Sequence, residues 1–225
     1  MESALASLLA ASVAFVGTHF ALSHPLRAPL VARTGEGGFA ILYSVVAFAT
    51  LGRMIVAFRE APQVDLAGSG EAGWVAATVL TLPALVLFLG SLWKNPALPN
   101  PGAAQAIDRA PTGVFAVTRH PMMWGFALWA LSHLVLLWSW RTTIVALAIL
   151  FLSLVGAHMQ DRKKAALMGA SWAGWEAKTS YWPRLTALPR AGLLLWLAAM
   201  ILWAALTWAH IGTAGVPAGI WRWIG

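Results

Sequence analysis

The chain has 225 residues, of which 60% are hydrophobic and 10% are charged, and its mean hydropathy of +0.72 excludes an ordinary soluble domain. Its 14 Trp residues favour a membrane–water interface, so its formal charge of +7 points to anionic lipid headgroups and topology, not to nucleic acid. The absence of Cys excludes disulfides, thiolate metal ligands, iron–sulfur clusters and covalently attached c-type haem.

The hydrophobic residues gather in six runs that are long enough to cross a bilayer, which needs about 20 residues of helix. Because helices satisfy their own backbone groups within lipid, we predict an all-α fold, a polytopic membrane bundle of about six transmembrane helices. Residues 1–225 form a single integral membrane domain in this interpretation, with a tight hairpin at Arg141 between the fourth and fifth runs. The runs are Ala4–Leu22, Phe39–Phe58, Trp74–Trp93, Met122–Trp140, Thr142–Met159 and Ala191–Ala209.

Three segments beside these runs also have a recognisable character. The amino terminus has no Lys or Arg before its apolar run, so it lacks the positive region of a signal peptide and is interpreted as a retained transmembrane helix. Residues 94–118 are rich in Pro, Gly and Ala, which predicts an irregular cytoplasmic lip. Residues 165–181 place Met168, Trp172 and Trp175 at i, i+4 and i+7, which predicts an amphipathic helix in the membrane interface.

The distribution of basic residues predicts the orientation. Eleven of the 15 Lys and Arg residues fall in the loops after the first, third and fifth runs. By the positive-inside rule these loops are cytoplasmic, and both termini face outward.

The segment from Arg119 to His133, RHPMMWGFALWALSH, concentrates ionisable groups in an apolar stretch. Pro121 suits the first turn of a helix, where its missing N–H has no partner to lose. Arg119 and His120 are therefore expected at a membrane surface. His133 follows Pro121 by 12 residues, roughly 18 Å at about 1.5 Å per residue, which places it within the hydrocarbon. An ionisable group at that depth is by default a functional-site hypothesis, although a lone His can also bond to a neighbouring helix.

His19 has a position comparable to that of His133. If the first helix continues past Pro25 to Arg33, His19 is 14 residues from its basic boundary, as His133 is from Arg119. The two imidazoles would then share one depth. That arrangement suits a haem held between two helices, one axial nitrogen approaching from each side.

Four further side chains are candidate cofactor-binding groups. Arg53, inside the second run, either snorkels to the surface or pairs with an anionic group such as a haem propionate. Arg119 is either a topology signal or an anion contact. His120 and His158 lie at cytoplasmic helix ends, close enough to converge and shallow enough to be surface groups. The remaining histidines, His24 and His210, are interpreted as interfacial groups.

Three segments, THFALSHPLR, RHPMMWGFALWALSHL and GAHMQDRKKAALMG, resemble the NnrU family, whose plant relative is the 15-cis-zeta-carotene isomerase. The resemblance covers nearly the whole chain. It implies a six-helix protein of the bacterial inner membrane, linked to nitrite and nitric oxide respiration. It also implies haem b with axial ligands matching His19 and His133, both of which count as catalytic candidates. The isomerase has a cysteine three residues before its second ligand, where this chain has Ala130, so that redox switch is not carried over.

A second resemblance leads to another function. The RHP segment, the later G-x-x-W-x-x-W and the W-P-R that follows are similar to isoprenylcysteine carboxyl and phospholipid methyltransferases. That resemblance implies an S-adenosylmethionine site lined by Arg119, His120 and Asp161. Those enzymes use two adjacent glutamates where this chain has Asp161 and Arg162, which counts against methyl transfer.

We therefore expect a haem-b membrane protein with redox or isomerase-like chemistry. It would act on a lipophilic polyene by cis–trans isomerisation, or serve nitric oxide and denitrification, with membrane lipids as its surroundings. The alternatives are the methyltransferase and a non-enzymatic assembly factor for nitrogen-oxide reductases.

Overall fold

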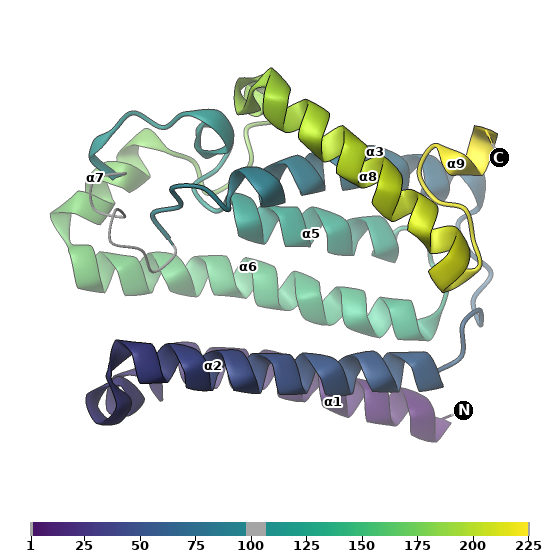
Figure 1. The fold of residues 1–225 in the computed structure, drawn as a ribbon, viewed down its shortest axis with the longest axis horizontal. Coiled ribbons are helices and arrows are strands. Elements are labelled where there is room, and N and C mark those ends of the chain that lie inside the picture. Colours follow the sequence, from purple (N-terminus) through teal and green to yellow (C-terminus); the bar gives the residue numbers. More distant parts are fainter. Residues whose placement is uncertain (1, 98–106, 225) are drawn as a thin grey trace. The chain divides into compact units, whose positions relative to one another are not determined.

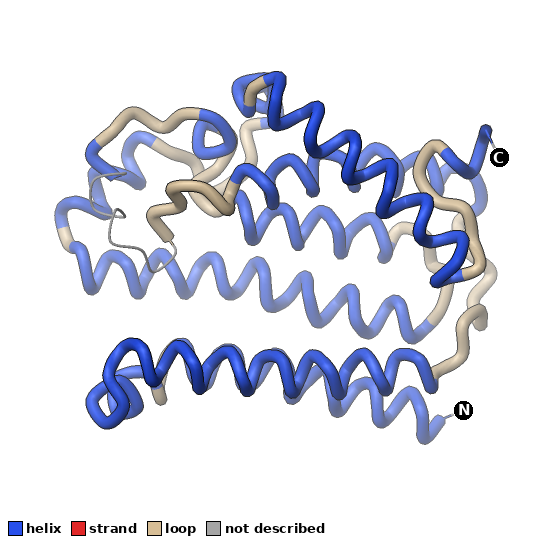
Figure 2. Tube along the Cα trace, viewed as in Figure 1, coloured by secondary structure: helices blue, strands red, loops and turns tan. Residues whose placement is uncertain are grey.

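The structure is a computed structural model that describes residues 2–97 and 107–224. All regular structure in these residues is helical, as Figure 1 and Figure 2 show, and this confirms the all-α prediction for the described part of the chain. The α-helices are α1 (Glu2–Ser23), α2 (Arg27–Glu60), α3 (Gly70–Gly90), α5 (Pro121–Leu134), α6 (Trp140–Met168), α7 (Ala170–Lys178), α8 (Leu193–Ala214) and α9 (Trp221–Ile224), and the short 3-10 helices are η1 (Gly113–Ala116) and η2 (Leu185–Ala191).

The chain divides into two compact units. The first comprises Met1–Gly68 and Leu137–Leu152, which hold α1, α2 and the first part of α6. The second comprises Ser69–Leu136 and Ser153–Gly225, which hold the other helices and the rest of α6.

In the first unit, α1 and α2 form a helical hairpin, seen side by side in Figure 1. The chain reverses at residues 24–26, so the first helix ends at Ser23 and does not continue through Pro25. The reason is steric, because the ring of Pro25 disfavours helical geometry at the preceding residue and removes a helix hydrogen bond. The comparison of depths between His19 and His133 assumed that continuation, and it therefore loses its basis.

The hairpin buries a compact apolar cluster. The i, i+3, i+7 spacing of Leu8, Ala11 and Phe15 puts one face of α1 against α2, and side chains from the start of α6 pack around it. Arg141, expected at a hairpin tip, is buried here instead. Its Nη1 donates to the carbonyl oxygen of Ala61 at 3.1 Å, and its guanidinium lies 4.5 Å from the centre of the Phe58 ring. It therefore satisfies backbone acceptors at the end of α2.

In the second unit, α3 packs against both α5 and α8. The contact with α5 is close, because a Cβ on Gly125 would lie 2.8 Å from the carbonyl oxygen of Ala84 and 3.1 Å from the amide nitrogen of Phe88. The contact with α8 includes a hydrogen bond of 2.9 Å from Trp203 Nε1 to Thr81 Oγ1. The close approach at Gly125 joins α3 to α5, and the hydrogen bond between Trp203 and Thr81 joins α3 to α8.

The fourth predicted span is shorter than expected. Helix α5 begins at Pro121, as its sequence predicts, but ends after 14 residues, about 21 Å, which is less than a bilayer core requires. The chain then turns, with Leu137 at a φ of 47° and the Leu136 carbonyl accepting a bond from Ser69 N. Among the described residues, five helices are long and apolar enough to span a membrane, namely α1, α2, α3, α6 and α8. The prediction of six is not confirmed, and His133 lies in the last turn of α5.

The predicted interfacial helix packs against protein. Helix α6 runs on to Met168, and α7 follows after Gly169. Trp172 and Trp175 on α7 are 0% and 2% exposed, and they pack with Ala97 and Ile107. The apolar stripe thus covers a protein core. Most of the predicted lip, residues 98–106, lies outside the described residues.

Candidate functional site

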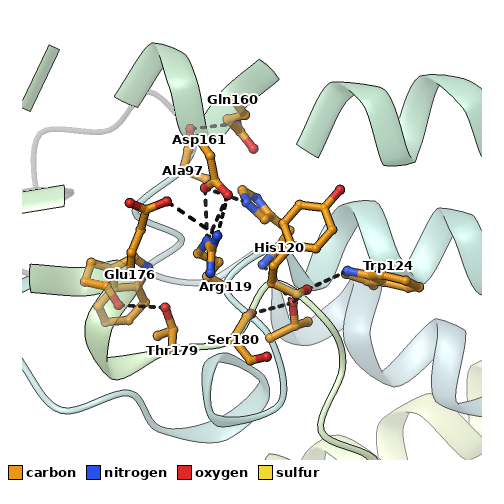
Figure 3. Close-up of polar contacts among 12 residues, drawn as sticks. Ala97, Arg119, His120, Trp124, Gln160, Asp161, Glu176, Thr179 and Ser180 are labelled. Carbon is orange, nitrogen blue, oxygen red and sulfur yellow. Dashed lines mark hydrogen bonds and ion pairs between the residues drawn. The ribbon is translucent and has the colours of Figure 1, made fainter. Parts of the chain in front are cut away.

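A buried ion pair joins the segment before α5 to α6. Arg119 donates from Nε to both carboxylate oxygens of Asp161 at 3.0 Å, and from Nη2 to Oδ2 at 2.6 Å. Its Nη2 also lies 3.4 Å from Oε1 of Glu176 on α7. Figure 3 shows the guanidinium linked to both carboxylates. The side chains of Arg119 and Asp161 are only 12% and 11% exposed, so the two charges are largely neutralised by each other.

His120 adds a third donor to the same carboxylate. Its Nε2 donates to Asp161 Oδ1 at 2.7 Å, and its side chain is fully buried. Its Nδ1 is buried as well and has no partner among the described residues.

Backbone carbonyls of the loop after α7 accept hydrogen bonds from residues at the start of α5. The Arg119 amide donates to the Ser180 carbonyl at 2.9 Å, and Trp124 Nε1 donates to the Tyr181 carbonyl at 2.8 Å. The Tyr181 hydroxyl in turn donates to the Leu154 carbonyl at 2.9 Å. The loop after α7 therefore locks the entry to α5 against α6.

A pocket of about 480 Å³ opens beside this network. Four of its lining residues, including His158 and Arg162, stand on one face of α6 at i, i+3, i+4 and i+7. Burial raises the pKa of the Tyr181 hydroxyl, the negative charge of Asp161 raises it further, and Arg119 partly opposes this. Tyr181 therefore presents a neutral hydroxyl at physiological pH. The lining includes Arg119, His158, Asp161, Arg162, Glu176 and Tyr181.

His19 lies apart from this pocket, in the first unit. Its Nδ1 lies 2.7 Å from the carbonyl oxygen of Phe15, one turn earlier on α1. Its ring packs on the Phe15 ring with 4.3 Å between centroids and meets Tyr43 edge-on at 5.5 Å. The Nε2 atom has no hydrogen bond to a described residue and remains available as a ligand.

His133, in the second unit, has the same local arrangement. Its Nδ1 lies 2.9 Å from the carbonyl oxygen of Trp129, one turn earlier, and its ring is 4.3 Å from the Trp129 ring. Its Nε2 is likewise without a hydrogen-bond partner in the described part of the chain. Since His19 and His133 belong to different units, their meeting on one iron stays a prediction.

The two candidate propionate partners are both occupied. Arg53 Nη2 donates to Ser7 Oγ at 2.7 Å, and Ser7 precedes His19 by 12 residues, about 18 Å along α1. Arg119 lies at the start of α5 and His133 in its last turn, again about 18 Å beyond Pro121. Neither arginine therefore lies beside the histidine of its own unit.

Sequence reasoning missed three residues of interest. Glu176 and Tyr181 line the pocket, and both stand next to the W-x-x-W and W-P-R segments, which could have drawn attention to them. His210, interpreted as interfacial, repeats the arrangement of the other two histidines, with Nδ1 2.8 Å from the Leu206 carbonyl oxygen. Within residues 2–97 and 107–224, no three His, Asp or Glu side chains form a group that could hold a metal ion.

Comparison with known proteins identifies one family. The family model described as NnrU protein matches residues 7–218. No curated protein matches the chain, and no solved structure does. The family match spans nearly the whole chain, including α1 with His19, α5 with His133 and the charged residues around Asp161, so the chain belongs to the NnrU family.

Proposed function

We propose that this chain is an integral protein of the bacterial inner membrane that binds haem b through His19 and His133. In this proposal both termini face the periplasm, which follows from the basic loops only if α5, short as it is, serves as a sixth crossing. The observation that carries it is the arrangement shared by the two histidines. Each bonds through Nδ1 to the carbonyl four residues earlier and leaves Nε2 without a partner among described residues.

This hydrogen bonding suits a ligand to iron. A ring that donates from Nδ1 to a fixed carbonyl holds its proton there, so the lone pair is on Nε2. The bond also raises the basicity of the ring and fixes its orientation. A porphyrin iron approached by two such nitrogens would be held by imidazoles whose rotation is already restricted.

The neighbouring aromatic rings strengthen the fit. Phe15 and Trp129 each pack at a tilt against the adjacent imidazole, with ring centroids 4.3 Å apart in both cases. This contact limits the rotation of the imidazole. Bound haem would supply one-electron chemistry and, if one of the two imidazoles were released, a site for nitric oxide or for a lipophilic polyene undergoing cis–trans isomerisation.

Arg53 and Arg119 each already have a partner within the protein. Arg53 is engaged by Ser7, and Arg119 is held by Asp161. Binding of propionates by either arginine would have to compete with those bonds. We therefore assign the haem to the two histidines alone, and Arg119, His120 and His158 to the separate charged site.

An optical spectrum tests the proposal. The protein expressed with excess haem and purified in detergent should show a Soret band, and His133→Ala should abolish it. His158→Ala is the control, because His158 lines the separate charged pocket and should leave the band unchanged. Absence of a Soret band in the wild type, or a band unaffected by His133→Ala, would refute the proposal.

A second candidate function is S-adenosylmethionine-dependent methyl transfer. The observation that favours it is the convergence of Arg119, His120 and Asp161, with a pocket of about 480 Å³ beside them. Arg162, lining that pocket where the similar enzymes carry a carboxylate, argues against it. Calorimetry with S-adenosylmethionine decides. Binding heat that is lost in an Asp161→Asn variant shown by its melting curve to be folded supports this candidate, and no heat from the wild type at high protein concentration eliminates it.

A further inference from the structure

The pocket beside Arg119 is lined by one carboxylate, that of Glu176, and one guanidinium, that of Arg162, which are not paired with each other. Arg119 and Asp161 neutralise each other through three short contacts. Glu176 retains only a long contact of 3.4 Å to Arg119, and its side chain is 36% exposed. Arg162 is exposed, and its guanidinium makes no hydrogen bond or ion pair to any described residue. A carboxylate and a guanidinium therefore both face this cavity with capacity to bind.

Two further side chains, His158 and Tyr181, line the same cavity. His158 stands one turn before Arg162 on α6, on the same face. The Tyr181 hydroxyl donates its proton to the Leu154 carbonyl, so it faces a ligand as an acceptor. The lining thus offers the donors of the Arg162 guanidinium and the acceptor oxygens of Glu176 and Tyr181.

The chemistry of this lining fits a zwitterion. A guanidinium binds a phosphate through two parallel N–H bonds, and a carboxylate binds a primary ammonium through charge-assisted hydrogen bonds. A phosphate and an ammonium a few bonds apart satisfy both groups at once. A quaternary ammonium has no N–H to donate and would fit Glu176 less well.

The surroundings place the pocket at headgroup depth. It lies where the apolar part of α6 ends and the run Gln160 to Lys164 begins. Trp182, next to Tyr181 in the chain, has its ring 5.6 Å from the Tyr181 ring and is 66% exposed. Exposed Trp prefers the membrane–water interface, which favours a depth near the lipid headgroups for this end of α6.

From these observations we infer that the pocket binds the phosphoethanolamine headgroup of a membrane lipid, with Arg162 at the phosphate and Glu176 at the ammonium. This inference does not depend on haem. The His19 and His133 sites can fail while the headgroup site holds, and the reverse is also true, since the Soret band and lipid retention are measured separately.

The test measures lipid retention by the full-length protein. The protein is exchanged into mixed micelles containing equal amounts of phosphatidylethanolamine, phosphatidylcholine and phosphatidylglycerol, and the bound lipids are quantified by native mass spectrometry. The wild type should retain phosphatidylethanolamine preferentially. Arg162→Gln should lower that retention on the order of tenfold, because it removes a charge-assisted hydrogen-bond donor.

Matched variants separate binding from folding. Arg162 has no partner among the described residues, so Arg162→Gln should melt like the wild type. Lys178→Gln removes an exposed cation from α7 that does not line the pocket and should leave retention unchanged. Glu176→Gln should lower the preference for phosphatidylethanolamine over phosphatidylcholine specifically.

Three outcomes would overturn the inference. One is equal retention of all three lipids by the wild type. Another is a folded Arg162→Gln protein that retains phosphatidylethanolamine normally. The third is displacement of the lipid by soluble S-adenosylmethionine but not by O-phosphoethanolamine, which would assign the pocket to a soluble zwitterion.

Discussion

His133 is held by Trp129 in two ways at once. The Trp129 carbonyl oxygen lies 2.9 Å from His133 Nδ1, and the indole ring lies 4.3 Å from the imidazole. The i, i+4 spacing on α5 produces both contacts, because side chains one turn apart share a face. The imidazole of His133 is therefore bonded at Nδ1, while its Nε2 has no hydrogen-bond partner among the described residues.

Trp129→Ala should weaken haem retention without abolishing it. The carbonyl bond survives, while the ring contact, worth about 0.5–1.5 kcal/mol for an aromatic pair, is lost. Haem content per chain measured after gel filtration checks this, and Trp129→Phe should restore most of it. Trp208→Ala, which removes an exposed Trp from α8, serves as the control. Unchanged haem content in Trp129→Ala would show that the indole does not position His133.

Asp161→Asn should destabilise the second unit by about 3 kcal/mol. The change leaves Arg119 buried without its counter-charge, and loss of one partner of a buried pair is costly. Denaturant unfolding in detergent checks the prediction. Glu176→Gln should cost far less, since that contact is long and more exposed. Asp108→Asn, at an exposed position, is the control, and equal stability of the Asp161 and Asp108 variants would contradict the expectation.

Tyr181 should ionise at a higher pH than an ordinary tyrosine. Burial and Asp161 raise the pKa of its hydroxyl in the folded protein. The stability that depends on its protonated form is therefore complete below the unfolded value of about 10 and is lost as the pH rises through the folded value. The chain has only two Tyr residues, so tyrosinate absorbance of Tyr43→Phe reports Tyr181 alone. A titration midpoint for Tyr181 at or below the ordinary tyrosine pKa would contradict this prediction.

Gly125→Ala should lower stability by about 1–3 kcal/mol, the usual cost of overpacking. The added Cβ would meet backbone atoms of α3, which cannot move aside as a flexible side chain can. Thermal unfolding compared with Gly17→Ala checks it, because a Cβ at Gly17 has nothing within 4 Å. Equal melting temperatures for the two variants would mean that α3 and α5 are not in close contact.

The long helices could be predicted from hydropathy, while their ends and partners could not. Pro121 predicts the start of α5 correctly, because proline is tolerated in a first turn. Its end at Leu134 is invisible in the apolar string LVLLWSW, since the turn uses Leu137 at positive φ without Gly or Pro. The stripe of Trp172 and Trp175 predicts a helix, yet periodicity is the same whether the apolar face meets lipid or protein.

The candidate site, like the helices, could be predicted from the sequence only in part. Arg119 and His120 could be placed at a helix entry from sequence. Their partner Asp161 is 42 and 41 residues away, and such a contact follows from tertiary packing alone. His19 and His133 each bond to a carbonyl four residues earlier on the same helix. Such local bonds follow from helix geometry and could be predicted from the sequence.

Electron paramagnetic resonance of the oxidised, haem-loaded protein tests the central claim most directly, because it reports how many imidazoles bind the iron. The wild type should give the low-spin ferric signal of two axial histidines, and both His19→Ala and His133→Ala should lose it. A low-spin signal that persists in either variant, or a wild type with only high-spin iron, would contradict a haem shared by His19 and His133.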